Sequence, residues 1–194
     1  ALDYLKDKDL VYACWLTRKE ASSTLNAPHN HISQNASLRV NDQELKNRKS
    51  LGLTPAWRLN IKNCLKYINS QKEKIYWEDI KQGKNLLNLD QFGDVIIARK
   101  DILTSYHLSV TVDDNSDGVT HIIRGNDLES YTNIHRLLQV LLNLRETKWF
   151  HHKLVKDTNG KRIAKRSNSK LTIKELRKNG YSAKEVIKLA KSST

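Results

Sequence analysis

The spacing of apolar residues changes between residues 93 and 142, and this change constrains the fold more than any other feature. GDVIIARKD at 93–101 carries a short apolar run that is typical of a strand. YHLSVTVDD at 106–114 alternates, with one side formed by Tyr106, Leu108, Val110 and Val112. Alternation with a period of two predicts a second strand there.

After the turn NSDG, the pattern predicts a third strand and then a helix. VTHIIRG at 119–125 reads as a short buried strand. Thr132 can cap the helix, whose apolar residues recur at helical spacing at Ile134, Leu137, Leu138, Leu141 and Leu142. Units of strand, helix and strand favour an α/β sheet with a nucleotide-type crevice at the strand ends.

The patterns elsewhere are weaker. In chain order we expect a helix at the start, a strand in 10–16, mostly loop over 21–41, a short helix at 42–51, and extended segments in 53–61 and 75–80. The tail is predicted to be helical. Its first helix ends on Asn179 and Gly180, which suit a C-cap, and its second opens with a capping box from Ser182 to Glu185.

The composition indicates a globular protein with an anionic partner. The chain has 194 residues, 38% of them hydrophobic, which suits one domain or one domain with a small appendage. Lys and Arg outnumber Asp and Glu by 34 to 21, and the net charge of +13 points to nucleic acid or phosphorylated small molecules. The sequence has no apolar run of the length that a membrane span needs.

Cysteine usage and the first residues favour a cytoplasmic protein. The only cysteines, Cys14 and Cys64, make no disulfide framework. The opening ALDYLKDKDL carries charges where a signal peptide would need an apolar core. The sequence contains no Met, so we expect that it begins inside a larger protein.

Two residues near the predicted strand ends are candidates for binding an anion. Arg124 ends a strand and precedes a glycine, a position suited to clamping a carboxylate or phosphate, and Tyr106 flanks the same unit. The alternative for Arg124 is an ion pair with Asp113, Asp114 or Asp127. Asp113 and Asp114 could themselves hold a metal or orient a hydroxyl or amine, or they could cap the following turn.

Histidines form two further clusters. His29 and His31 could join Cys14 in a zinc site, but a closed site needs four ligands and neither cysteine has a near cysteine partner. His151 and His152 could hydrogen-bond a nucleotide, or they could be a partly exposed strand start.

GKRIAKR at 160–166 is a glycine-started basic segment. Taken alone it could be a charged surface turn. Downstream of a nucleotide-type fold, it could instead close over a triphosphate and neutralise developing charge. It is not a P-loop, because G-x-x-x-x-G-K-[ST] occurs nowhere in the chain.

Three motifs together carry a resemblance to a known family: GDVIIARKDILTSYHLSVTVDD, GVTHIIRGNDL and GKRIAKR. The segment from Gly93 to Arg166 resembles the second half of the catalytic domain of class I glutamate-specific aminoacyl-tRNA synthetases. Within that family it looks most like the shorter glutamyl-Q tRNA(Asp) synthetases, because Leu128 stands where ordinary ligases tend to have histidine. The resemblance implies a Rossmann-like catalytic domain.

The resemblance also implies an activity. These enzymes activate L-glutamate with ATP and Mg²⁺ and transfer the glutamyl group to the queuosine base in the anticodon of tRNA(Asp), which makes them tRNA-modifying ligases. The alternatives are an ordinary glutamate–tRNA ligase that charges tRNA(Glu), and a catalytically dead tRNA-binding fragment. We expect a cytoplasmic monomer with no membrane partner.

Individual residues take roles by the same resemblance. Tyr106 and Arg124 match the family's glutamate-binding positions. The ATP-binding loop corresponds to Arg162, Ile163, Ala164, Lys165 and Arg166, with Lys165 as the catalytic lysine and Ala164 in place of the usual serine. Cys14 matches the first cysteine of the family's zinc site, but Leu16 occupies the second, which argues against zinc.

The resemblance predicts two regions. We expect residues 1–166 to be a partial catalytic domain, with 21–92 as an insertion-like or connective region, and 167–194 to be a helical tail. The family's H-I-G-H-like ATP signature is absent and would precede Ala1. We therefore expect a C-terminal half of the catalytic domain that is inactive on its own.

Overall fold

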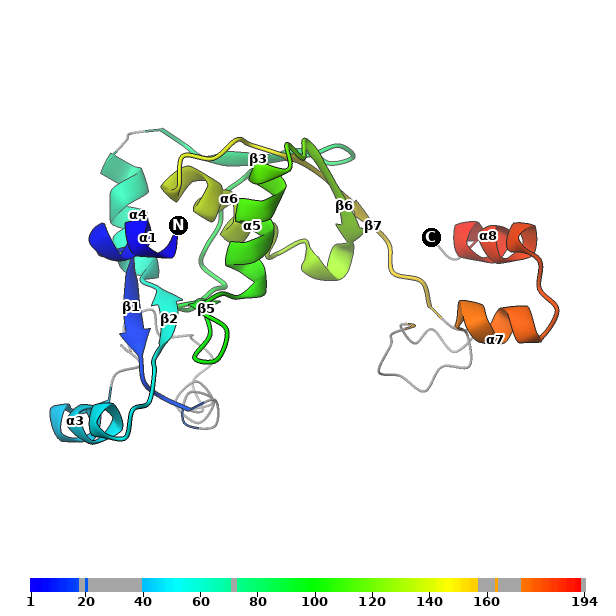
Figure 1. Cartoon of the computed structure of the whole chain (residues 1–194). Helices are drawn as coiled ribbons and strands as arrows, with labels where there is room; N and C mark the ends of the chain where they lie inside the picture. Colours follow the sequence, from blue (N-terminus) through cyan, green and yellow to red (C-terminus); the bar gives the residue numbers. More distant parts are fainter. Residues whose placement is uncertain (18–19, 21–39, 71–72, 157–162, 164–171, 193–194) are drawn as a thin grey trace.

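The structure, a computed structural model, describes residues 1–17, 20, 40–70, 73–156, 163 and 172–192. Its described part is a mixed α/β fold with two small sheets and helices packed beside them (Figure 1). The α/β class predicted from the sequence is therefore confirmed. Among the described helices, none is long and apolar enough to cross a membrane.

The first sheet is antiparallel and has the order β1-β2-β5. Its strands are β1 (Val11–Cys14), β2 (Ala56–Leu59) and β5 (Ile96–Ala98), each within a segment that the sequence predicts to be extended. Three helices accompany it: α1 (Leu2–Asp7), α3 (Asp42–Ser50) and α4 (Ile61–Ser70). The Asp94 side chain ties the sheet to α4, because it accepts hydrogen bonds from the Tyr12 hydroxyl at 2.8 Å and from the Ile61 N–H at 3.1 Å.

The second sheet has the order β4-β3-β7-β6. Its strands are β3 (Tyr76–Asp79), β4 (Gly83–Leu86), β6 (His121–Gly125) and β7 (Lys148–His152). Strands β3, β7 and β6 run parallel, while β4 pairs with β3 as an antiparallel hairpin. Parallel strands need long crossovers, and here α5 and α6 supply them. The carboxyl ends of three strands consequently meet at one edge.

The strand predicted at 106–114 is wrong, because Tyr106–Ser116 form helix α5. Leu108 and Thr111 are buried at helical spacing, and the Thr111 hydroxyl donates to the carbonyl oxygen of His107 at 2.8 Å. The polar residue Thr111 can therefore be buried, because its hydroxyl makes its hydrogen bond within the helix. The β-branched residues and the apparent alternation were overridden by packing of α5 against α6 and β5.

Two further expectations need correction. The strand at 119–125 exists as β6, but it is an edge strand and is not buried, with Ile123 71% exposed. The helix after it is α6 (Thr132–Leu141), but Thr132 does not cap it, because Tyr131 holds the N-cap position without a side-chain hydrogen bond. The Thr132 hydroxyl instead contacts Arg124 and His151.

The main core forms where α6 packs against α4, α5 and the strands. Helix α6 contributes fully buried residues at helical spacing, as the sequence predicts: Ile134, Leu137, Leu138 and Leu141. Residues from the 56–92 part of the chain join them, including Leu59, Ile61, Cys64, Ile68, Leu89 and Phe92.

Two short helices form the described part of the tail, α7 (Ile173–Lys178) and α8 (Ala183–Ser192). Gly180 has a φ of +83°, a left-handed conformation that glycine adopts without strain after a helix end. At the start of α8, Glu185 accepts a hydrogen bond from the Ser182 N–H at 2.8 Å. Both end signals predicted from the sequence are confirmed.

Candidate ligand-binding site

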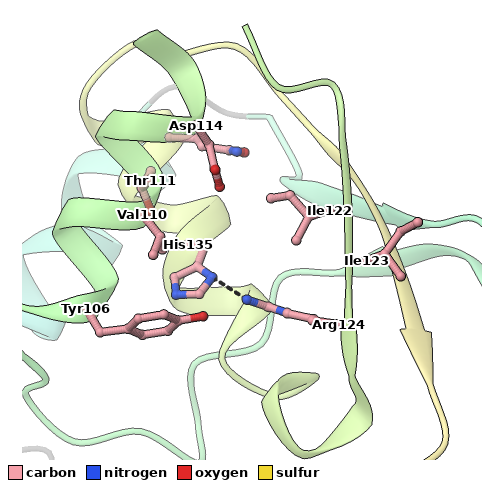
Figure 2. Close-up of a pocket in the computed structure, with 9 residues that line it drawn as sticks. Tyr106, Val110, Thr111, Asp114, Ile122, Ile123, Arg124 and His135 are labelled. Atoms are coloured by element: carbon pink, nitrogen blue, oxygen red, sulfur yellow. Dashed lines mark hydrogen bonds between the residues drawn. The ribbon is translucent and has the colours of Figure 1, made fainter. Parts of the chain in front are cut away.

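A cavity of about 230 Å³ lies between α5, β6 and α6. Figure 2 shows its polar walls: Tyr106 and Asp114 come from α5, Arg124 from β6 and His135 from α6. Arg124 is next to the last residue of β6, and its guanidinium extends toward His135 (Figure 2). The cavity lies beside β6 and is lined by both predicted anion-binding residues, Tyr106 and Arg124.

Gly125 lets the chain turn tightly after Arg124. A Cβ atom at this position would lie 2.5 Å from Oδ1 of Asp127 and 2.8 Å from Cδ2 of Leu154. Distances that short require the Asp127 and Leu154 side chains to move, so a larger residue would first displace these two side chains.

Three side chains hold the Arg124 guanidinium. Its Nε donates to Nε2 of His151 at 3.2 Å, Nη1 to Nδ1 of His135 at 2.9 Å, and Nη2 to Oγ1 of Thr132 at 2.5 Å. Burial lowers the pKa of Arg124, and the nearby Tyr106 and Asp114 oppose this effect. The carboxylates therefore act on Arg124 through space, while its hydrogen bonds go to histidine, threonine and Tyr106.

His151, the first of these histidines, is anchored by a buried carboxylate. Nδ1 of His151 lies 2.8 Å from Oδ2 of Asp79, and both side chains are almost fully buried. Burial alone would raise the pKa of Asp79, but hydrogen bonds from His151 and from the N–H groups of Lys81 and Gln82 outweigh it and lower the pKa. Asp79 is thus a fully hydrogen-bonded carboxylate at the end of β3.

His107 and His135 form a second buried chain. Nε2 of His135 lies 3.0 Å from Nδ1 of His107. Burial, aided by the positive charge of Arg124, lowers the pKa of His135 to about 2 and that of His107 to about 4. Both rings are therefore neutral near pH 7, and a neutral ring can accept a hydrogen bond from arginine.

Tyr106 lies at the open side of the cavity and is 49% exposed. Its ring stacks edge-on against His135, with centroids 5.6 Å apart. Figure 2 shows its hydroxyl pointing toward Arg124. A phenol and a guanidinium that line the same cavity make this part of it suited to a carboxylate.

Asp114 faces the same cavity from the last turns of α5 (Figure 2). Burial raises its pKa, and the charge of Asp113 raises it further. The backbone of this helix end is closed by main-chain hydrogen bonds, with the Asp117 N–H donating to the Asp113 carbonyl oxygen at 2.8 Å. Both aspartates therefore belong to a helix rather than to a strand end, and Asp114 is left as a charged group of the cavity wall.

The other predicted site residues lie elsewhere or outside the described residues. His152 contacts the carbonyl oxygen of Lys153 through Nδ1 at 2.8 Å. Ile163 is described, and its N–H donates to the Val155 carbonyl oxygen at 3.0 Å. The rest of 160–166, with Arg162, Ala164, Lys165 and Arg166, lies outside the described residues, as do His29 and His31.

Cys14 does not sit in a metal-binding set. It is buried, with Tyr12 beside it and Leu16 packed against both. The part of the chain that the structure describes contains no group of three His, Cys, Asp or Glu side chains that could hold a metal ion. The described residues around Cys14 do not fit a zinc ion.

Four residues of the Arg124 network were not found from the sequence as site residues: Asp79, His107, Thr132 and His135. Asp79 offered one signal, an acidic residue at the end of a predicted strand. His107 and His135 offered no such signal, because a single histidine within a predicted strand or helix is usually a simple core residue.

Comparisons with known proteins cover most of the chain. Residues 15–191 match the family described as tRNA synthetases class I (E and Q), catalytic domain. The chain is 32% identical to a glutamyl-Q tRNA(Asp) synthetase from Rhodobacter capsulatus, over 97% of this chain and 69% of that protein. It is 30% identical to glutamate–tRNA ligase 2 of Bartonella tribocorum, over 92% of this chain but only 40% of that ligase.

Two solved structures of glutamate–tRNA ligases have a fold similar to that of this chain. A glutamate tRNA ligase from Elizabethkingia meningosepticum, solved in complex with its amino acid, is similar with a TM-score of 0.62 and 20% identity. The match covers 93% of this chain and 35% of that one. A glutamate–tRNA synthetase from Elizabethkingia anophelis is similar with the same TM-score and 18% identity, over 36% of its length. Likeness at this identity concerns the fold alone.

Proposed function

Because the chain belongs to the family of class I tRNA synthetase catalytic domains for glutamate and glutamine, we propose that the cavity beside Arg124 and Tyr106 binds L-glutamate. The observation that carries this proposal is that both residues line a single cavity, Tyr106 from α5 and Arg124 from β6, which pairs in parallel with β7. A guanidinium can bind a carboxylate through two parallel hydrogen bonds, and a phenol can donate a third.

The activity we propose for the whole protein is a two-step ligation. ATP and L-glutamate form glutamyl-adenylate and pyrophosphate, and the glutamyl group then passes to the queuosine base of tRNA(Asp) with release of AMP. Lys165, within the loop from Arg162 to Arg166, is proposed to contact the ATP phosphates, which Mg²⁺ also binds. Leu128 in RGNDL and the similarity to the Rhodobacter capsulatus protein support tRNA(Asp) as the acceptor.

We further propose the division into domains stated from the sequence. Residues 1–166 would form part of the catalytic domain, with 21–92 as a connective region, and 167–194 would form a helical tail. The net charge of +13 supports a tRNA partner under this arrangement.

The second candidate is an ordinary glutamate–tRNA ligase. It is supported by 30% identity to the Bartonella tribocorum ligase, nearly as high as to the glutamyl-Q enzyme. Both candidates need the same glutamate pocket. What distinguishes them is the RNA that receives the glutamyl group.

Glutamate binding can be tested on the chain itself by isothermal titration calorimetry. We expect L-glutamate to bind, while D-glutamate and L-glutamine bind more weakly or not at all. Arg124→Ala should abolish binding, whereas Arg145→Ala, an exposed arginine outside the cavity, should leave it unchanged. Equal binding of L-glutamine would contradict a role of Arg124 as a clamp for the side-chain carboxylate, which is the group that glutamine lacks.

A further inference from the structure

Arg124 is held by partners from two elements, and one of these partners is anchored from a third. His151 lies on β7, His135 and Thr132 on α6, and Asp79 at the end of β3 anchors His151. We propose that Asp79, His151 and His135 are positioning residues, which fix the orientation of the Arg124 guanidinium for an incoming carboxylate. This inference rests on the proposed glutamate pocket.

Arginine can only donate hydrogen bonds, so its partners must present acceptor atoms. The three contacts of Arg124 use three of its five N–H bonds. One N–H on Nη1 and one on Nη2 lie outside these three contacts. The Tyr106 hydroxyl also interacts with the guanidinium, so a ligand carboxylate would bind beside that hydroxyl. The network therefore immobilises the guanidinium without consuming the donors that a ligand needs.

The donor-only character of arginine also determines the histidine tautomers. Nε2 of His151 faces the Arg124 Nε–H and must be unprotonated, so the ring proton is on Nδ1 and is donated to Asp79. Nδ1 of His135 faces the Arg124 Nη1–H, so its proton is on Nε2 and is donated to His107. Two histidines thus hold opposite tautomers around one guanidinium.

Asp79 can accept from both His151 and the Lys81 and Gln82 N–H groups only as a carboxylate, because both of its oxygens must then be acceptors. Its Oδ1 already accepts from the Lys81 and Gln82 N–H groups at 2.9 and 3.0 Å, and Oδ2 accepts from His151. In Asp79→Asn, the side-chain NH₂ group must face either the Lys81 and Gln82 N–H groups or the His151 ring. If it faces His151, the His151 ring has to move its proton to Nε2, and that N–H would then oppose the Arg124 Nε–H.

Rigid positioning affects binding because a free arginine side chain loses rotamer freedom when it binds a ligand. A guanidinium already held at three points loses little of that freedom. Residues that orient a binding group in this indirect way typically change affinity by about 10- to 100-fold at metal sites, and we expect a similar scale here.

The tautomers can be tested without any ligand by ¹⁵N NMR of the histidine rings of the chain. We expect His151 to carry its proton on Nδ1 and His135 on Nε2 near pH 7. We also expect a slowly exchanging Arg124 Nε–H signal, because that hydrogen is bonded to a buried ring. Observation of the Nε2–H tautomer for His151 in the native chain would overturn the proposal.

Three substitutions connect this network to glutamate binding. Asp79→Asn should shift His151 to the Nε2–H tautomer and weaken glutamate binding by about tenfold. His135→Leu should weaken it similarly, whereas His135→Asn should bind better than His135→Leu, because its Oδ1 takes the place of Nδ1. Glu78→Gln, an exposed neighbour of Asp79 that pairs with Lys148, is the matched control and should change neither readout.

The outcomes separate this inference from the proposed function. If the native chain shows the expected tautomers but does not bind L-glutamate, the glutamate proposal fails while the network is verified. If the chain binds L-glutamate and Asp79→Asn keeps the affinity within about twofold, the positioning roles are rejected. If Asp79→Asn does not fold, the native tautomers and the comparison of the two His135 variants decide.

Discussion

Nδ1 of His151 lies 2.8 Å from Oδ2 of Asp79, although 72 positions separate the two residues in the chain. The parallel pairing of β3 with β7 brings them together, since Asp79 is opposite Trp149 in the register. Through His151 this pair reaches Arg124 on the next parallel strand. The sheet thus joins residues from three strands into one hydrogen-bonded network.

Arg124→Lys should weaken L-glutamate binding although it keeps the positive charge. Lysine cannot make the planar contacts with Thr132, His135 and His151, and it cannot bind a carboxylate in a fork. Charge-assisted hydrogen bonds are worth about 1.5 to 3 kcal/mol, so we expect a loss of about 10- to 100-fold in affinity. Calorimetric titration measures this, with Arg145→Lys as the control. An affinity unchanged by Arg124→Lys would mean that charge alone attracts the ligand.

Tyr106→Phe should weaken L-glutamate binding by about five- to tenfold, because it removes one hydrogen-bond donor and keeps the ring. The side chain is 49% exposed, so the free energy of unfolding should stay nearly the same. Titration and urea denaturation together separate the two effects. Tyr181→Phe, which alters a similarly exposed tyrosine in the tail at 43% exposure, should leave both measurements unchanged.

Stability should fall as the pH is lowered from about 6.5 to 4. The pKa of His107 is lowered from 6.5 to about 4 by burial and by the charge of Arg124. In this window the unfolded chain binds a proton at His107 that the native chain does not bind, so the free energy of unfolding decreases. Above pH 6.5 the ring is neutral in both states, and this dependence disappears.

His107→Asn isolates that contribution. The asparagine oxygen can still accept the hydrogen bond from His135, but the residue does not titrate. Urea denaturation at pH 7 and pH 5 should show a smaller loss of stability for this variant than for the native chain. His121→Asn, on the exposed edge strand, serves for comparison. Equal pH dependence in the native chain and in His107→Asn would refute the buried neutral histidine.

Leu138→Ala should destabilise the fold by about 2 to 5 kcal/mol, because it leaves a cavity in the core between α6 and its neighbours. Leu103→Ala removes the same atoms from a side chain that is 74% exposed, so it should change stability by less than about 0.5 kcal/mol. Urea denaturation measures both variants. A loss of similar size in the two would contradict the position of the core.

Local patterns predicted the elements that depend on local chemistry. The C-terminal helices follow from their caps at Asn179, Gly180 and Ser182, and α6 follows from its apolar spacing. Helix α5 was missed because Val and Thr favour strands, and its buried side includes Thr111, whose hydroxyl bonds within the helix. Only the packing of α5 on α6 resolves that ambiguity.

The site was predictable only in part. Arg124 was identifiable because it ends a strand before a glycine, and Tyr106 by family resemblance. The buried partners Asp79, His135 and His151 become visible as one network only when the strand register is known, since they come from distant parts of the chain. Long-range pairing of this kind leaves no periodic trace in a single sequence.

The central claim is tested most directly by following radiolabelled L-glutamate with the complete gene product, ATP and Mg²⁺. The acceptors are tRNA(Asp) with queuosine, tRNA(Asp) without it, and tRNA(Glu). We predict label only in queuosine-containing tRNA(Asp), recovered on the anticodon nucleoside after nuclease digestion. Label on the 3′ end of tRNA(Glu) would contradict the proposed function and identify an ordinary glutamate–tRNA ligase.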